Sequence, residues 1–319
     1  MTKMNSYVKK YAQVCEKLGI DYEFYAPFKR GMFLTRANNT RAFIYKSSTP
    51  LNNHSARITS HNKRLTVQLL KKAGIPTTEQ IRIKTLQELE AFYQQEKEIV
   101  VKPPNAKGGS GITILPSKDE LEMAFKTAQK FSPGILVEKY IPGQNFRFLV
   151  LDNKVLSVVL RKPPFVIGDG KSSIAELIRD MNTIHATAHI PEVKLSKETA
   201  RVLHKQECTF ETILPAGKEI LVRLTANLSK GATTEDITDI VPEVHKKIAV
   251  MAAKTLDLNF AGVDIICNDI KSSSSTSFVI EVNASPGLKM HYYEEKGRKR
   301  DVAETIIKAI YNQRNSTGE

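Results

Sequence analysis

The chain has 319 residues, of which 41% are hydrophobic and 25% are charged. This is ordinary globular composition with room for two or three packed units, and it excludes a largely disordered chain. Charges precede any apolar stretch at the N-terminus, and no run of about 18 apolar residues follows, so we expect a cytoplasmic protein without a membrane segment. The formal net charge of +13 fits an anionic partner, but the basic residues are dispersed without a nucleic-acid motif, so nucleic-acid binding is not expected.

Cysteine and histidine spacing argues against two further kinds of site. Cys15, Cys208 and Cys267 are far apart and odd in number, so we expect buried apolar side chains rather than disulfides or a zinc site. His185 and His189 stand four residues apart, but no glutamate between them supplies the base of a zinc peptidase. We expect both histidines to face solvent and assign no metal to them.

The first part of the chain predicts a small N-terminal unit. Apolar spacing indicates a helix over 7–18, and residues 22–25 form a short strand candidate. A second helix over 65–73 should end at Gly74 and Pro76, because glycine terminates helices and proline cannot continue them.

The middle of the chain alternates between helical and extended patterns, which indicates a compact α+β module. The predicted elements are a helix over 86–92, a strand over 99–102, a glycine loop over 107–111, a strand over 112–115, a helix over 118–130 and a strand over 135–138.

The last part of the chain predicts a larger unit. Two strands should pair across a polar, serine-rich hairpin loop at residues 271–277. The predicted elements are strands over 146–151 and 155–161, helices over 174–181 and 241–256, the paired strands over 260–267 and 277–282, and a final helix over 302–311.

A lysine and a glycine loop suggest phosphate binding. Lys102 ends an apolar strand, and Gly108, Gly109, Ser110 and Gly111 follow closely. Glycines let backbone N–H groups approach anionic oxygens, while a lysine at a strand end supplies a point charge. A tight turn beside a surface lysine is the alternative. A Walker phosphate loop is disfavoured at residues 168–172, because Phe165 replaces the glycine that it requires.

Three oxygen donors suggest a metal site. Asp264 lies in one apolar strand, and Glu281 and Asn283 lie two positions apart at the end of the next. Period-two geometry puts Glu281 and Asn283 on one face, and strand pairing can bring Asp264 beside them. Such donors suit Mg²⁺ bridging nucleotide phosphates. Solvated strand carboxylates are the alternative, but carboxylates within apolar strands favour the metal site.

Together these motifs resemble the ATP-grasp superfamily, in particular the ATP-grasp modules of cyanophycin synthetases and bifunctional glutathione synthetases. The resemblance covers roughly residues 60–310, and the order of many spaced motifs makes it specific. The motifs are NKRLT from residue 62, AGIP from 73, VVKP from 100, VEKYIPG from 137, NFR from 145, Arg161, VIGDGK from 166, ANLSKG from 226, GVD from 262 and EVNASPGLKMH from 281.

The resemblance implies a role for each matching residue. The phosphates of ATP would be held by Lys63 and Lys102 and covered by the glycine loop. The backbone of the hinge would read adenine, and Asn145 stands where relatives place an acidic residue for the ribose. The hinge consists of Glu138, Lys139, Tyr140 and Ile141.

The catalytic residues are likewise implied by the resemblance. Arg147 and Arg161 would face the transferred phosphate or a substrate carboxylate, and the turn at residues 168–171 would lie near the acceptor. Asp264, Glu281 and Asn283 match the ligands of Mg²⁺, with Mn²⁺ as a substitute. Arg161 and the backbone of residues 285–287 are candidates to stabilise a tetrahedral oxyanion, by analogy. Two departures, Asn62 for aspartate and Ala232 for a second glycine, should tune substrate contacts.

The resemblance therefore implies an α+β ATP-grasp fold with three lobes, at residues 1–76, 77–141 and 142–319, and ATP between the last two. The implied activity is an ATP-dependent carboxylate–amine ligase acting on amino acids or short peptides through an acyl phosphate. The net charge favours acidic substrates. Alternatives are a glutathione-synthetase-like or a peptide or secondary-metabolite tailoring ligase, and a non-catalytic nucleotide- or RNA-binding protein. Homo-oligomerisation stays open, because the sequence shows no heptad pattern.

Overall fold

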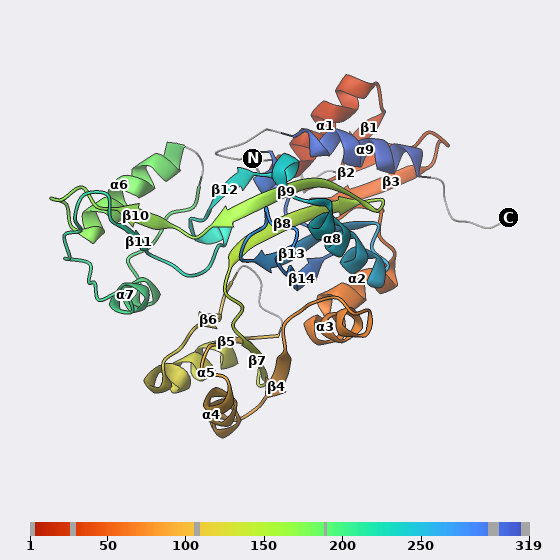
Figure 1. Ribbon diagram of the computed structural model, residues 1–319. Helices are drawn as coiled ribbons and strands as arrows, with labels where there is room; N and C mark the ends of the chain where they lie inside the picture. Colours follow the sequence, from red (N-terminus) through yellow and green to blue (C-terminus); the bar gives the residue numbers. More distant parts are fainter. Residues whose placement is uncertain (1–3, 26–29, 105–108, 188–189, 293–299, 314–319) are drawn as a thin grey trace. The chain divides into compact units, whose positions relative to one another are not determined.

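A computed structural model describes residues 4–25, 30–104, 109–187, 190–292 and 300–313 (Figure 1). The chain forms two compact units, each assembled from separated stretches of sequence. Unit 1 comprises Met1–Thr78, Phe146–Val159 and Asp236–Glu319, and unit 2 comprises Glu79–Asn145 and Leu160–Glu235. The division into three lobes at residues 76 and 141 stays a prediction.

Unit 1 is built on two sheets with helices. A small sheet has the order β1-β2-β3, and a five-stranded sheet has the order β12-β9-β8-β13-β14. The strands are β1 (Tyr22–Phe24), β2 (Gly31–Thr35), β3 (Arg41–Tyr45), β8 (Gln144–Leu151), β9 (Lys154–Lys162), β12 (Thr233–Asp236), β13 (Phe260–Cys267) and β14 (Phe278–Asn283). The helices are α1 (Ser6–Leu18), α2 (His54–His61), α3 (Lys63–Lys72), α8 (Glu243–Thr255) and α9 (Val302–Asn312). Three of the four unit boundaries along the chain fall inside β8, β9 and β12, and the fourth lies between Thr78 and Glu79.

Local signals explain where the helices of unit 1 begin and end. Asn5 caps α1 by accepting a hydrogen bond from the backbone of Tyr7, and Gly19 ends the helix with a φ of 65°. Asn62 ends α2 and also caps α3, because its side chain accepts a hydrogen bond from the backbone N–H of Leu65. This cap makes Lys63 the first residue of α3.

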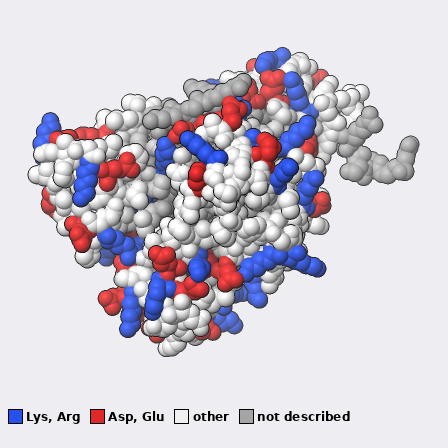
Figure 2. Space-filling view, in the orientation of Figure 1, with Lys and Arg blue, Asp and Glu red and all other residues white. Residues whose placement is uncertain are grey.

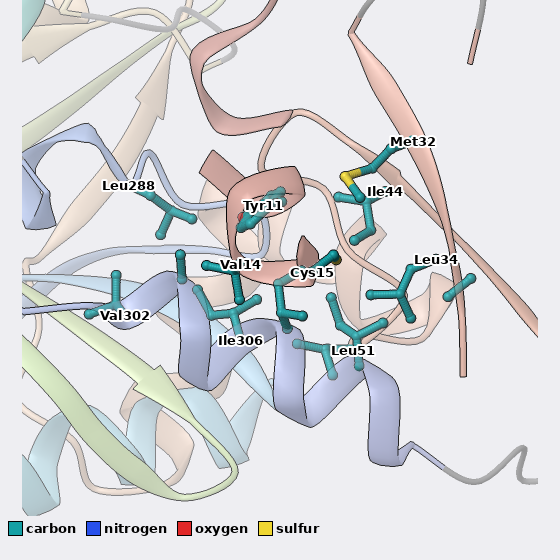
Figure 3. Packing of buried hydrophobic residues seen from close by; sticks show 14 of the residues in the cluster. Tyr11, Val14, Cys15, Met32, Leu34, Ile44, Leu51, Leu288, Val302 and Ile306 are labelled. Carbon is teal, nitrogen blue, oxygen red and sulfur yellow. The ribbon is translucent and has the colours of Figure 1, made fainter. Parts of the chain in front are cut away.

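The core of unit 1 joins the N-terminal segment to the end of the chain. Figure 3 shows Tyr11, Val14 and Cys15 of α1 among the buried side chains of this cluster, with Ile306 of α9. Met32, Leu34 and Ile44 from the small sheet and Leu288 from the segment after β14 belong to the same cluster. Burial of this apolar surface stabilises the association of residues that are about 290 positions apart in sequence.

Unit 2 contains two smaller cores. The first lies in a four-stranded sheet of order β4-β7-β5-β6 with its helices, and the second lies beside the pair β10-β11. The first group has β4 (Gln80–Ile83), α4 (Leu86–Gln95), β5 (Ile99–Lys102), β6 (Thr113–Ile114), α5 (Leu121–Gln129) and β7 (Ile135–Lys139). The second group has β10 (Phe165–Ile167), α6 (Ile174–Thr187), α7 (Lys197–His204) and β11 (Glu219–Leu221).

The structure confirms the α+β class and most of the predicted elements, and it adds elements that were not predicted, including β2, β3, β4, α2 and α7. All three cysteines are buried and free, as predicted. The prediction that His185 faces solvent is wrong, because α6 continues past residue 181 and turns His185 inward with Ile174 and Ile178. His189 lies outside the described residues. Among the residues described, no helix has the length and apolarity needed to span a bilayer.

Candidate functional site

In unit 1, the three predicted metal ligands lie on one face of the pair β13–β14. Asp264 is directly opposite Glu281, and Asn283 is opposite Gly262, two positions further along the same strand pair. Directly opposed residues of an antiparallel pair project to the same face, with Cβ atoms roughly 5 Å apart. The register shifts between Asp264 and Ile265, so a bulge adjoins the candidate ligands, a feature often found beside active sites.

Asp264 is bound by Arg147 in this structure. The guanidinium of Arg147 on β8 contacts both carboxylate oxygens, through Nε to Oδ1 and through Nη2 to Oδ2 at 3.2 Å. Both residues are buried, with exposed fractions of 6% and 7%. Burial alone would lower the pKa of Arg147, but the carboxylates of Asp264 and Glu281 raise it above its ordinary value. Arg147 therefore stays charged and neutralises Asp264.

Glycine at position 262 leaves the space that Arg147 occupies. A Cβ added at Gly262 would lie 2.7 Å from Nη1 of Arg147 and 2.6 Å from Cβ of Pro286. The segment after β14 therefore packs directly beside the Arg147–Asp264 pair. The pattern Gly262-Val263-Asp264 thus has a steric reason, because any side chain at its first position displaces the arginine.

Glu281 has a looser counter-ion. Nζ of Lys63 lies 3.6 Å from Oε1 of Glu281, and the side chains are 19% and 36% exposed. A lysine at the first position of a helix opposes the helix dipole, and this arrangement favours an anion at that end. Lys63 is thus placed where it can bind either Glu281 or the phosphate that the sequence analysis assigned to it.

The donor set fits a hard divalent cation. Asp264, Glu281 and Asn283 supply carboxylate and amide oxygens from one sheet face, and Mg²⁺ commonly keeps several waters and uses one or two protein carboxylates. Among the described residues, no group of three or more His, Cys, Asp and Glu side chains offers a metal site. Two carboxylates and an amide, rather than a closed protein cage, suit a cation shared with nucleotide phosphates.

In unit 2, Lys102 is held by Glu138. Nζ of Lys102 lies 2.7 Å from Oε2 of Glu138, and the two side chains are only 8% and 5% exposed. The side-chain amide of Gln80 donates to the same carboxylate oxygen at 3.2 Å. Glu138 was predicted to belong to the adenine hinge, and its side-chain role was not predicted. A glutamate within the apolar strand Ile135–Lys139 requires a partner, and this pattern could have indicated the role.

The described part of the glycine loop has the backbone conformation that requires glycine. Gly109 and Gly111 both have φ of 72°, and a Cβ at Gly111 would lie 2.7 Å from the ring of Phe131. Ser110 lies between them, whereas Gly108 is outside the described residues. A Cβ at Gly109 would meet the side-chain nitrogen of Asn227 at 3.4 Å, so the loop also borders the segment Asn227–Gly231.

The hinge residues have partners in unit 2 as well. Lys139 pairs with Glu96 at 3.0 Å, and the backbone N–H of Tyr140 donates to the carbonyl of Glu98 at 2.8 Å. This backbone donor of Tyr140 is therefore engaged in the sheet. Ile141 follows β7, and adenine recognition by the remaining backbone groups stays a prediction.

Asn145 and Arg161 bind each other. The side-chain oxygen of Asn145 accepts hydrogen bonds from Nε of Arg161, at 2.7 Å, and from Nη2. Asn145 was predicted to bind ribose and Arg161 to face a reacting group. The structure joins them through an uncharged acceptor, so these hydrogen bonds do not themselves neutralise the guanidinium charge.

The turn at residues 168–171 is fixed by Asp169. Its carboxylate accepts hydrogen bonds from the backbone N–H groups of Ser172 and Lys171 at 2.7 and 2.9 Å. These bonds, with that of the Ser172 hydroxyl, lower the pKa of Asp169 to about 2. A Cβ at Gly168 would lie 2.3 Å from the carbonyl oxygen of Pro215, so this position requires glycine. The predicted closeness of this turn to an acceptor substrate stays a prediction.

Unit 2 thus has a buried lysine and a glycine loop, and unit 1 has two carboxylates and an amide on one face of a strand pair. Comparison with known families agrees with these features. Residues 69–167 match the family described as D-ala D-ala ligase C-terminus, and residues 215–310 match the RimK-like ATP-grasp domain. The chain belongs to the ATP-grasp superfamily.

Individual relatives agree with this assignment. The chain is 34% identical over 260 residues to cyanophycin synthetase of Trichormus variabilis. The aligned region covers 78% of this chain and 29% of that protein. It is 31% identical over 276 residues to the glutathione biosynthesis bifunctional protein GshAB of Listeria innocua. This aligned region covers 83% of this chain and 36% of that protein. The crystal structure of a bifunctional glutathione synthetase from Pasteurella multocida matches with a TM-score of 0.69 and 25% identity, covering 97% of this chain and 44% of that chain.

The chain thus spans about a third of the length of these curated relatives, 29% of the first and 36% of the second. Similarity to them extends over most of this chain but leaves most of each relative unmatched. The activities in their names therefore carry over to this chain only as a proposal.

Proposed function

We propose that this protein is an ATP-dependent carboxylate–amine ligase that joins amino acids or short peptides. The observation that carries the proposal is the placement of Asp264 opposite Glu281 on β13–β14, with Asn283 on the same face and Arg147 beside them. This arrangement supplies hard oxygen ligands and a fixed cation in the order typical of the ATP-grasp superfamily. The buried Lys102 in unit 2 supplies the phosphate-binding charge.

The proposed chemistry has two steps. An oxygen of the donor carboxylate attacks the γ-phosphorus of ATP, the bond to the β-phosphate breaks, and ADP leaves an acyl phosphate behind. The amine then attacks the acyl carbon, loses a proton, and displaces phosphate to form the amide. Mg²⁺, or Mn²⁺ in its place, would neutralise part of the phosphate charge when bound.

The residues of this chain bind and orient the reactants. Asp264, Glu281 and Asn283 would hold the cation, and Lys63 and Lys102 would bind phosphate oxygens. Arg147 and Arg161 would stabilise negative charge on the transferred phosphate or the tetrahedral oxyanion. In a site that excludes water, preorganised groups interact with such charge more strongly than they do in water. No enzyme nucleophile is required, because positioning and charge provide the acceleration.

The identities of the substrates are open within this class. The net charge of +13 supports acidic amino acids or peptides. Figure 2 shows lysine and arginine side chains interspersed with acidic ones over the displayed face, so the support comes from the overall balance rather than from a basic patch on that face. A cytoplasmic location, where ATP and amino acids are available, belongs to the same proposal.

The test is release of ADP and phosphate from Mg²⁺–ATP with a panel of amino acids and dipeptides, singly and in pairs, with mass spectrometry of the products. We expect one pair to yield a product lighter by one water than the sum of its parts. Glu281→Gln and Lys102→Met should abolish turnover, whereas the surface controls Glu122→Gln and Lys126→Met should retain it. Absence of a ligated product with every pair, despite binding of Mg²⁺–ATP, would reject the proposal.

A further inference from the structure

Residues of the N-terminal segment contact the loop formed by residues 284–289. This loop begins directly after Asn283, and its Pro286 packs beside Gly262 and Arg147. A shift of the loop would therefore disturb both a candidate metal ligand and the arginine that holds Asp264. From sequence, residues 1–60 were predicted only to belong to an N-terminal lobe.

The first contact is made by Asn52, which is 6% exposed. Its side-chain nitrogen donates to the carbonyl of Ala284 at 2.9 Å and to the carbonyl of Phe260 at 2.6 Å. Its side-chain oxygen accepts from the backbone N–H of Phe260 at 2.9 Å. One buried amide thus fixes the start of the 284–289 loop to the start of β13.

The second contact is made by Ser47, whose hydroxyl donates to the carbonyl of Ser285 at 3.2 Å. This bond holds the carbonyl of Ser285 and does not involve the N–H groups of the loop. Asn52 and Ser47 therefore act on consecutive residues of the loop.

The third contact is made by Tyr7 on α1. Its hydroxyl would lie 3.7 Å from a Cβ at Gly287, so the ring reaches the glycine of the loop. Burial raises the pKa of Tyr7, whereas the backbone of Leu288 and Lys289 and the charge of Arg147 favour its ionised form. Leu288 anchors the same loop in the core cluster that contains Tyr11 (Figure 3).

We infer that Tyr7, Ser47 and Asn52 are positioning residues that fix the 284–289 loop, so that its backbone and Arg147 meet the reacting acyl group in one geometry. This inference rests on the proposed function. In an acyl transfer, donors must be placed within a few tenths of an ångström of the developing oxyanion, and small displacements cost large factors in rate. The N-terminal segment is then part of the active site rather than a separate lobe.

Tyr7→Phe is the sharpest variant, because it keeps the packed ring and removes only the hydroxyl. Tyr22→Phe is the matched control: it also removes a hydroxyl of the N-terminal segment, which donates to Glu16 at 2.6 Å. We expect Tyr7→Phe to lower kcat/KM for one member of the substrate pair about tenfold, with KM for ATP unchanged within about twofold. Ser47→Ala should show the same pattern more weakly, and Tyr22→Phe should match the unmodified protein.

Hydrogen exchange of the whole 319-residue chain gives a second measurement that needs no substrate. The backbone amides of residues 287–289 should exchange faster in Tyr7→Phe and not in Tyr22→Phe. Unchanged exchange, or faster exchange with wild-type kinetics for both substrates, overturns the inference. If no substrate pair is ligated by the unmodified protein, the proposed function fails, and exchange with Mg²⁺–AMPPNP bound then decides alone whether Tyr7 positions the loop.

Discussion

The candidate ligand groups of the two units are neutralised in opposite senses. In unit 1 the anionic groups that would hold a cation are paired with internal cations, Arg147 on Asp264 and Lys63 on Glu281. In unit 2 the cationic group that would hold a phosphate is paired with an internal anion, Glu138 on Lys102. A buried charge without a partner is costly, so each binding group needs a counter-ion before its ligand arrives. Ligand binding therefore amounts to an exchange of partners, and a variant that removes one partner isolates its contribution.

The largest effect is expected from Arg147→Met. This change leaves Asp264 buried without its cation, and breaking such a pair costs about 3–5 kcal/mol of stability. Because Mg²⁺ would then be the cation nearest to Asp264, it should raise the melting temperature of Arg147→Met more than that of the unmodified protein. Calorimetry with and without Mg²⁺ measures both effects. Equal stabilisation of the two proteins by Mg²⁺ would remove Asp264 from the ligand set.

The corresponding variant in unit 2 is Glu138→Gln, which removes the anionic partner of Lys102. Lys102 and Gln80 lose their carboxylate, and because Gln retains a polar oxygen near Nζ we expect a loss of about 3 kcal/mol, at the lower end of the range for a broken buried pair. ADP or ATP should recover more stability in this variant than in the unmodified protein, since phosphate oxygens can replace the carboxylate.

Glu122→Gln is the control for this experiment, because it breaks the exposed pair with Lys126 on α5. Exposed pairs contribute about 0–1 kcal/mol, so the control should differ little from the unmodified protein and show ordinary nucleotide stabilisation. A nucleotide effect of equal size in Glu138→Gln and in the control would mean that Lys102 does not bind phosphate.

The sequence predicted the strands that carry these groups better than it predicted their partners. Strand patterns placed Lys102 at the end of β5 and Asp264 within β13, because alternating or continuous apolar runs are local signals. The pairing of Glu281 opposite Asp264 was foreseen as a consequence of a hairpin. The counter-ions were not, because Arg147 reaches Asp264 across 117 positions and no local pattern records that contact.

The elements that were missed have weak local signals. β2 and β3 pair in a small sheet whose outward face carries aromatic side chains, so their sequences lack the clear alternation of apolar and polar residues. The capping role of Asn62 shows a different limit. In sequence this residue is a departure from relatives, whereas in the structure it has a conformational role at the junction of α2 and α3.

A smaller loss of stability is expected when the pair Lys63–Glu281 of unit 1 is broken than when Arg147–Asp264 is broken. Lys63→Met removes a partner that is 3.6 Å from Glu281 and partly exposed, so the expected loss of stability is below about 1 kcal/mol. Binding of Mg²⁺–ATP should nevertheless weaken strongly, because the same lysine would contact the phosphates. Calorimetry for stability and isothermal titration for nucleotide affinity test the two statements separately. A stability loss as large as that of Arg147→Met would show that exposure does not distinguish the two pairs.

The smallest effect concerns a carboxylate whose ionised form is stabilised mainly by hydrogen bonds rather than by a counter-ion. The native pKa of Asp169 is about 2, below the ordinary value of 3.8, because backbone N–H groups of Ser172 and Lys171 donate to it. A depressed native pKa contributes stability that is present above the unfolded pKa and is lost as pH falls through the native pKa. The difference in melting temperature between the unmodified protein and Asp169→Asn should therefore be constant near neutral pH and shrink between about pH 4 and pH 2. A difference that stays constant down to pH 2 would show that these hydrogen bonds do not favour the ionised carboxylate.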